Sequence, residues 1–223
     1  MKNIFIACDT TSIHKVRKII NQSKTKIKGY QIGYKFGLEF FYSKNGRKFI
    51  SKIKSKNLWL DVKIFDIPNT GAASVTSLKD LKNISYITVH ISGGLEMLKK
   101  IKKTVKKNNK KLKILGVTIL TSFSNSTIKT IGHTKTINEI VKKQVSLAKQ
   151  AGLNGIVCSA HEAKLLKKIS KNMEIITPGI RLKGDSSGDQ KRIMTPAEAF
   201  KNGATSIVIG RSLTKGNFKN NFQ

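Results

Sequence analysis

Short apolar runs rich in branched and aromatic residues alternate with longer segments whose apolar positions recur every three or four residues. The short runs are typical of strands, and the longer segments are typical of amphipathic helices. The pattern predicts strands at residues 3–8, 29–34, 58–63, 86–90, 112–119, 155–158, 174–177 and 206–209. It predicts helices at residues 12–22, 44–55, 70–81, 94–107, 137–151, 160–168 and 196–202.

This alternation of strands and helices indicates an α/β architecture with a parallel sheet. Eight units in 223 residues average about 28 residues each, at the short end for a (β/α)8 TIM barrel. A doubly wound open sheet is the alternative, but the first strand is not followed by the G-x-G-x-x-G turn typical of dinucleotide-binding folds. Without a linker, low-complexity block or longer repeat, we expect one barrel domain over residues 1–223.

The C-terminal ends of barrel strands meet at one rim, where the chemistry of such folds is concentrated. Several polar residues lie at or just beyond the predicted strand ends. They are Asp9, Lys35, Asp61, Lys63, Asp66, His90, Thr121, Ser122, Arg181 and Arg211. Taken singly, most have an ordinary structural explanation, such as a surface lysine or a hydrogen-bonded histidine. Their convergence on one rim favours a functional site.

The third predicted strand carries an unusual set of charges. Asp61 and Lys63 are two residues apart, so their side chains point to the same face of the strand. Asp66 follows in a loop, because proline cannot continue the ladder and residues 69–70 suit a helix cap. Two acids flanking one lysine are costly to bury, and they indicate either a structural ion-pair network or a catalytic group.

The segment 179–190 contains three glycines and two serines in twelve residues, which predicts a mobile loop. Arg181 and Gln190 at its ends offer donors to an anion. Arg211, directly after Gly210, offers a bidentate guanidinium group. A phosphate site after the seventh and eighth strands recurs in barrels, so we expect one here. The alternative is a surface loop with an unrelated arginine.

Positive charge dominates the composition, with 43 Lys and Arg against 12 Asp and Glu, a net charge of +31. Such an excess favours polyanionic partners. The lysines lie along predicted helices, most densely at residues 99–113, where they fill the faces not occupied by apolar residues. Because aromatic residues are not interleaved with them, we expect solvated helix faces and no specific nucleic-acid site.

No apolar run approaches the length of a membrane span, and the N-terminal run is too short for a signal peptide, so neither a membrane segment nor export is expected. Cys8 and Cys158 lie in strand-like apolar runs without ligand-spaced partners. They are expected to be buried free thiols in a reducing compartment. The sequence thus predicts a cytoplasmic protein without a metal site.

The ten residues from Asp61 to Thr70, DVKIFDIPNT, resemble the catalytic signature of the orotidine 5'-phosphate decarboxylase family. The resemblance covers nearly the whole chain. Further similar segments are residues 117–122, 157–160, 177–181, 188–196 and 208–211.

The resemblance implies a TIM barrel that converts orotidine 5'-monophosphate to uridine 5'-monophosphate and CO2, the last step of UMP biosynthesis, with no cofactor. By position, Lys63 would donate a proton to pyrimidine C6, and Asp61 would lie against the departing carboxylate. Asp66 and Thr70 would reach into the neighbouring subunit's site, which implies a homodimer with shared sites.

The resemblance also implies the substrate contacts. Asp9 and Lys35 would contact the ribose hydroxyls, and either Thr121 or Ser122 would contact the base. The segment that contains Pro178 would border the substrate. The phosphate would be bound by Arg181, Gln190, Gly210 and Arg211, with the loop before Gln190 closing as a lid.

Two alternatives remain open. One is a Mg²⁺-dependent sugar-phosphate decarboxylase or aldolase of a related barrel group, such as the 3-keto-L-gulonate 6-phosphate decarboxylases, which shares the D-x-K-x-x-D arrangement. The continuation at residues 67–70 and the loop at 188–190 favour the pyrimidine enzyme. The other alternative is a polyanion-binding protein that uses its net charge of +31.

Overall fold

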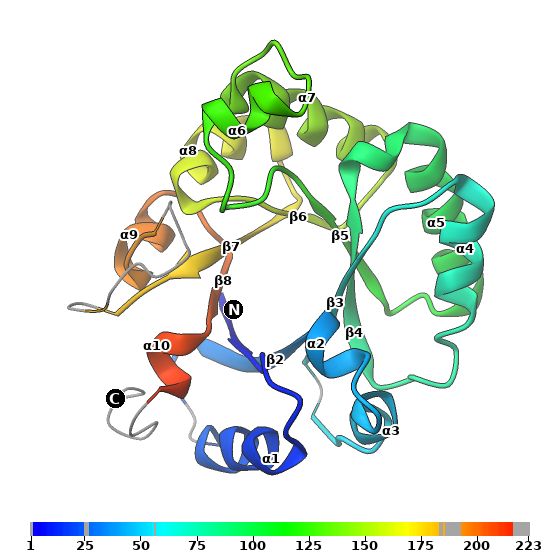
Figure 1. Ribbon diagram of the computed structural model, residues 1–223, viewed down its shortest axis with the longest axis vertical. Coiled ribbons are helices and arrows are strands. Elements are labelled where there is room, and N and C mark those ends of the chain that lie inside the picture. The colour runs from blue at the N-terminus through cyan, green and yellow to red at the C-terminus, as the bar shows by residue number, and fades with distance from the viewer. Residues whose placement is uncertain (1, 25–26, 56, 183–184, 186–192, 216–223) are drawn as a thin grey trace.

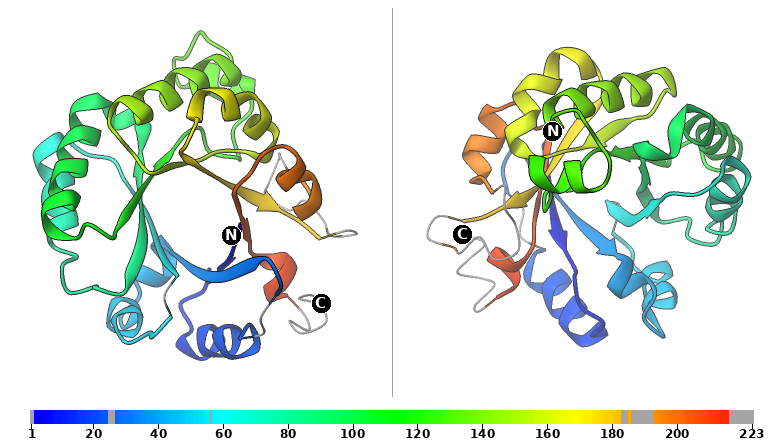
Figure 2. Two further views of the ribbon diagram at one scale, coloured as in Figure 1. Left: turned by 180° about the vertical axis from the view of Figure 1, so that it is seen from behind. Right: turned by 45° about the horizontal axis from the view of Figure 1, so that its top comes forward.

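The computed structural model describes residues 2–24, 27–55, 57–182, 185 and 193–215. Its strands form a closed barrel in chain order, β1 to β8, and each strand is parallel to its neighbours. Helices surround the strands, as Figure 1 shows from one side and Figure 2 from behind. The predicted (β/α)8 TIM barrel is therefore confirmed, and the open-sheet alternative is wrong. That residues 1–223 form one domain stays a prediction.

All eight predicted strands are present, and all but the last differ from the prediction at one or both ends. They are β1 (Lys2–Ala7), β2 (Tyr30–Gly37), β3 (Leu58–Ile64), β4 (Ile84–His90), β5 (Lys113–Val117), β6 (Gly155–Val157), β7 (Glu174–Ile180) and β8 (Ser206–Ile209).

Two of these shifts move candidate site residues into strands. Lys35 lies inside β2 and Pro178 inside β7, whereas the sequence placed both beyond the strand ends. The Lys35 side chain is held by Asp9 and Asp61, which come from the neighbouring strands. Pro178 is tolerated because the β7–β8 register shifts between Thr177 and Ile180, where no regular ladder bond is lost.

The seven predicted helices also occur. They are α1 (Ile13–Gln22), α3 (Gly46–Ser51), α4 (Pro68–Thr76), α5 (Gly94–Asn108), α7 (Ile137–Gln150), α8 (Ala160–Ser170) and α9 (Pro196–Lys201). The sequence missed four short elements, which are too short to show a helical period. They are α2 (Leu38–Phe41), the 3-10 turn η1 (Ile91–Gly93), α6 (Asn125–Thr130) and α10 (Arg211–Thr214).

The start of α4 differs from the prediction. We expected a cap at residues 69–70, but the helix begins at Pro68, with Ile67 as the N-cap residue. Proline suits the first helical position, because its fixed φ is helical and its missing N–H has no intrahelical acceptor there. Asp66 therefore lies immediately before the helix, at its exposed end.

Apolar side chains fill the interior of the barrel. This inner cluster consists of Phe5, Ala7, Trp59, Tyr86, Leu115, Val117, Val157, Ile176 and Val208. The rings of Trp59 and Tyr86 each pack edge-on against Phe5, with centroids 5.1 and 5.3 Å away. Since Trp59 and Val117 also line the cavity at the rim, the packed core forms the floor of that cavity.

None of the helices in the described ranges combines the length and apolar character needed to cross a bilayer. Both cysteines are buried free thiols, as expected.

Burial raises the pKa of the Cys8 thiol to about 12. At about pH 8 the thiolate, which is the reactive form, is then only about one part in 10⁴. We expect iodoacetamide to leave Cys8 unmodified in the native protein and to modify it after denaturation in urea. Mass spectrometry of the Cys8 peptide measures this directly. Equal modification rates in the two states would contradict the buried position.

Candidate active site

A cavity of about 420 Å3 opens at the C-terminal ends of the strands. Ten of the thirteen residues to which the family resemblance assigns a role line it. They are Asp9, Lys35, Asp61, Lys63, Thr121, Ser122, Pro178, Arg181, Gly210 and Arg211. Asp66 and Thr70 lie elsewhere, and Gln190, with most of the expected lid, falls outside the described residues.

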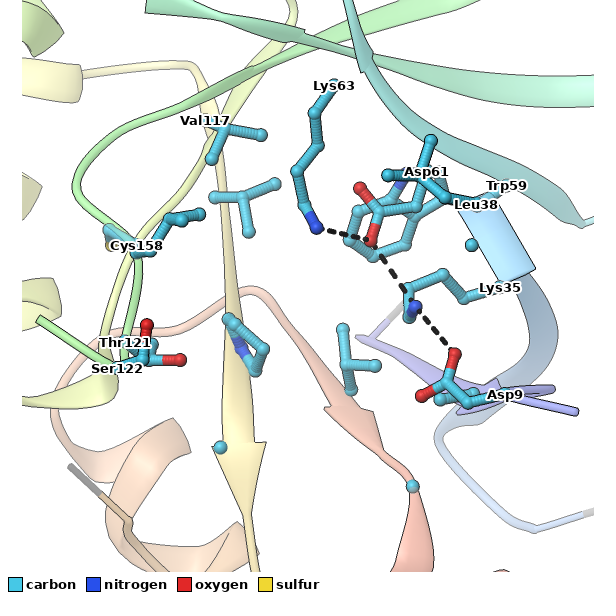
Figure 3. A pocket seen from close by; sticks show the side chains of 18 of the residues that line it. Asp9, Lys35, Leu38, Trp59, Asp61, Lys63, Val117, Thr121, Ser122 and Cys158 are labelled. Carbon is cyan, nitrogen blue, oxygen red and sulfur yellow. Dashed lines mark hydrogen bonds and ion pairs between the residues drawn. The ribbon is translucent and has the colours of Figure 1, made fainter. Parts of the chain in front are cut away.

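Four charged side chains of alternating sign form a row along one wall of this cavity (Figure 3). Lys35 Nζ lies 3.3 Å from Asp9 Oδ1 and 3.3 Å from Asp61 Oδ2. Lys63 Nζ lies 3.8 Å from the same Asp61 oxygen. The order Asp9, Lys35, Asp61, Lys63 follows β1, β2 and β3 around the rim, so parallel neighbours bring together residues that are far apart in the chain.

Lys35 is the buried centre of the row. Burial alone would lower the pKa of its amine, but the carboxylates of Asp61 and Asp9 outweigh that effect and raise the pKa above its usual value. The amine therefore stays charged, as a buried cation with two anionic partners should. The possibility that Lys35 is a surface lysine is wrong.

Asp61 is held at both carboxylate oxygens and is only 7% exposed. Oδ2 faces the two lysines, and Oδ1 accepts a hydrogen bond of 2.9 Å from the hydroxyl of Thr88. The carboxylate therefore has little freedom to rotate, and its position relative to the Lys63 amine is set by Lys35 on β2 and Thr88 on β4.

Lys63 is the more accessible of the two lysines, with 38% of its side chain exposed against 11% for Lys35. Its backbone is unusual, because φ is +48°, a value rare for residues other than glycine. The β3–β4 register shifts at this point, between Leu60 and Ile64. Its amine extends over the cavity toward Asp61 (Figure 3), where it could meet a bound ligand.

Asp66 and Thr70 lie outside the cavity of their own chain. They border a second hollow of about 480 Å3, which Lys63 also lines. Asp66 is exposed, and its Oδ1 accepts a hydrogen bond of 2.7 Å from the N–H of Ile67. Within one chain, Asp66 is therefore not paired with the Lys63 amine.

The phosphate end of the expected site has two arginines. Arg181 is 7% exposed and donates to the carbonyl of Ile180 over 3.1 Å, while Arg211 begins α10 and is exposed. Burial and then the positive charge of Arg211 lower the pKa of Arg181. Two guanidinium groups close enough to repel each other favour an anion between them.

Thr121 and Ser122 lie together on the wall opposite the charged row, beside Cys158 (Figure 3). Both line the cavity, so which of them meets a ligand stays open.

In the described part of the chain, no group of three His, Cys, Asp or Glu side chains is arranged to hold a metal ion. The two cavity acids, Asp9 and Asp61, both pair with Lys35.

The sequence missed Thr88. It lies on β4, has no exposed surface, and bonds both Asp61 and the backbone N–H of Lys63. Threonine is an ordinary strand residue, so nothing in the local sequence distinguishes it.

His90 lies at the end of the same strand, and its Nδ1 accepts a bond from the N–H of Ser92. Burial and then the charge of Lys63 lower the pKa of His90.

Comparison with known proteins gives one consistent family. The family model described as "Orotidine 5'-phosphate decarboxylase / HUMPS family" matches residues 2–219. The orotidine 5'-phosphate decarboxylase of Wolbachia from Brugia malayi is 41% identical, over 97% of this chain and 94% of the relative. The enzyme of the same name from Coxiella burnetii is 36% identical, over 95% of this chain and 89% of the relative.

A solved structure agrees with these relatives. The crystal structure of orotidine 5'-phosphate decarboxylase from Lactobacillus acidophilus matches with a TM-score of 0.84 and 28% identity. The match covers 100% of this chain and 96% of the other.

Proposed function

The chain belongs to the orotidine 5'-phosphate decarboxylase / HUMPS family, and from that premise we propose that it converts orotidine 5'-monophosphate to uridine 5'-monophosphate and CO2. The predicted family is confirmed. The observation that carries the proposal is the row of alternating charges that ends at the Lys63 amine, inside a cavity lined by ten of the residues expected for this reaction.

Lys63 supplies the chemistry. When the bond between C6 and the carboxylate breaks, CO2 leaves and the electron pair stays on C6, where the ring delocalises it poorly. An ammonium beside that carbon stabilises the developing negative charge and then transfers a proton to it, leaving a neutral amine that solvent reprotonates. Asp61 forms an ion pair with this amine, with Nζ 3.8 Å from Oδ2.

We further propose that Asp61 repels the substrate carboxylate. Repulsion of this kind destabilises the bound ground state, and its weight in catalysis is contested, so we rank it second to electrostatic stabilisation by Lys63. Lys35 offsets part of that repulsion, since its amine contacts both cavity acids.

The substrate's other groups find partners along the cavity. We assign the phosphate to Arg181, Gly210 and Arg211, with Gln190 as a further ligand. We assign the ribose hydroxyls to Asp9 and Lys35. The base is assigned to Thr121 or Ser122, beside Pro178. Contacts remote from C6 can supply binding energy that is used at the reacting carbon. This division of roles fits a cavity that is lined both by two arginines and by the paired charges.

We propose that Asp66 and Thr70 act in the site of a neighbouring subunit, in a homodimer. Their position outside their own cavity supports this assignment. So do exposed apolar side chains around them: Tyr42 is 75% exposed, Phe65 64% and Ile67 66%. Apolar side chains gathered on one face are typical of a protein–protein interface.

The main alternative is a Mg²⁺-dependent sugar-phosphate decarboxylase or aldolase, which the double name of the family does not separate from our proposal. Two observations favour the cofactor-independent reaction. The reported relatives carry the name of the pyrimidine enzyme, and both cavity acids pair with Lys35, which competes with a cation for their oxygens. A cytoplasmic location stays a prediction.

The test is a spectrophotometric assay of the purified protein with orotidine 5'-monophosphate in excess EDTA. We expect decarboxylation at the same rate with and without the chelator. Absence of turnover would refute the proposed reaction. Turnover that EDTA removes and Mg²⁺ restores would refute cofactor independence.

A further inference from the structure

The fully buried hydroxyl of Thr88 connects the two central groups of the candidate site. Its Oγ1 accepts a hydrogen bond of 2.9 Å from the backbone N–H of Lys63 and donates one of 2.9 Å to Asp61 Oδ1. The hydroxyl is therefore an acceptor toward Lys63 and a donor toward Asp61. We propose that Thr88 is a positioning residue that holds the Asp61 carboxylate and the Lys63 backbone in register for catalysis.

The need for such a residue comes from the irregular end of β3. Leu60 pairs with Ile87 and Ile64 with Val89, so β3 advances four residues while β4 advances two. The extra residues interrupt the regular ladder, and the Lys63 N–H is directed to the hydroxyl of Thr88 in place of a β4 carbonyl.

The hydrogen bond from the Lys63 N–H to Thr88 matters because the backbone of Lys63 has an unusual conformation. Its φ of +48° is disfavoured for a side chain with a Cβ, so the surrounding structure must hold it there. Among the described residues other than glycine, only Lys171 shares a positive φ, and it follows the end of α8. The bond to Thr88 ties the unusual backbone of Lys63 to a fully buried residue on the neighbouring strand.

Asp61 depends on the same hydroxyl. Its carboxylate is nearly buried, and the Thr88 donor occupies the oxygen that does not face the lysines. Loss of the donor would leave a buried acceptor unsatisfied and free the carboxylate to rotate away from the Lys63 amine. Thr88 thus acts on Lys63 in two ways. It bonds the backbone N–H of Lys63, and it holds Asp61, which is the ion-pair partner of the Lys63 amine.

This inference rests on the proposed decarboxylation, so the experiment begins with the wild-type rate. Thr88→Val keeps the shape of the side chain and removes the hydroxyl, and we expect kcat to fall by about 10- to 100-fold, the effect of one lost hydrogen bond to a charged group. KM should change by less than about threefold, because the phosphate and ribose contacts are unaltered. Thr88→Ser keeps the hydroxyl and should retain kcat to within about threefold.

The matched control is Thr177→Val on β7. Thr177 is also fully buried, but its hydroxyl has no hydrogen-bond partner among the described residues, and it does not line the cavity. Its replacement should leave kcat within about twofold of wild type.

The outcomes separate the two proposals. An inactive wild-type protein would refute the proposed function. An active wild type with equal kcat in Thr88→Val and Thr177→Val would overturn the positioning role. If Thr88→Val does not fold, Thr88→Ser and Thr88→Ala, which differ by one hydroxyl, are compared instead, and equal kcat values for that pair would overturn the inference.

Discussion

Replacing Lys63 with alanine is expected to lower kcat for decarboxylation of orotidine 5'-monophosphate by at least about 10³-fold, within the range of general-acid catalysis and with electrostatic stabilisation lost as well. The Lys63 amine lies at the open end of the charged row, 3.8 Å from Asp61. Lys35 cannot substitute for it, because that amine is buried between two carboxylates.

The measurement is a steady-state assay on folded protein, with circular dichroism to verify the fold. Lys99→Ala is the matched control, since Lys99 is an exposed lysine of α5 that does not line the cavity. It removes the same charge from a chain of net charge +31 and should leave kcat unchanged. A loss of only a few fold in Lys63→Ala would contradict the role of proton donor.

The fold could be predicted because each strand and most helices carry their own local pattern. Leu58 to Ile64 is a run of branched, aromatic and alternating charged residues, and residues 94–108 keep apolar positions on one face. Alternation of such units leaves few topologies. Once a barrel is assumed, the rim follows, and with it the convergence of Asp9 and Arg211 on one cavity.

What the sequence could not supply were the contacts between strands. Lys35 is one of many lysines in a very basic chain, and only the neighbouring β1 and β3 strands bring Asp9 and Asp61 to its amine. Thr88 is similar, since its bonds to Lys63 and Asp61 are made where the register of the opposite strand shifts. A pattern of period two predicts which face Lys63 occupies, but not that its backbone adopts a positive φ.

The charges of the cavity differ from those of the surface. In a chain with 43 basic and 12 acidic residues, two of the acids are placed inside the cavity and each is matched to a lysine. The charged row is thus neutral overall, and the positive excess of the cavity comes from Arg181 and Arg211. This arrangement suits a substrate with an anionic phosphate at one end and a carboxylate that must leave at the other.

Mixing two inactive variants is expected to restore activity if sites are shared between subunits. Lys63→Ala lacks the proton donor, and Asp66→Ala lacks the acid assigned to the neighbouring site. In a hybrid dimer, one site combines Lys63 of one chain with Asp66 of the other and is intact, while the second site lacks both. Random pairing of equal amounts makes about half of the dimers hybrids, so about a quarter of wild-type activity is expected.

Each variant is taken alone through the same dissociation and re-pairing as the control, and native mass spectrometry of chains with different mass tags confirms exchange. Recovery is expected because Asp66 does not reach the Lys63 amine of its own chain but lines the outer hollow beside exposed Tyr42 and Phe65. Confirmed exchange without recovery would mean that Asp66 serves its own chain. An Asp66→Ala variant with full activity would remove Asp66 from the site altogether and leave the Lys63 amine with its ion pair to Asp61.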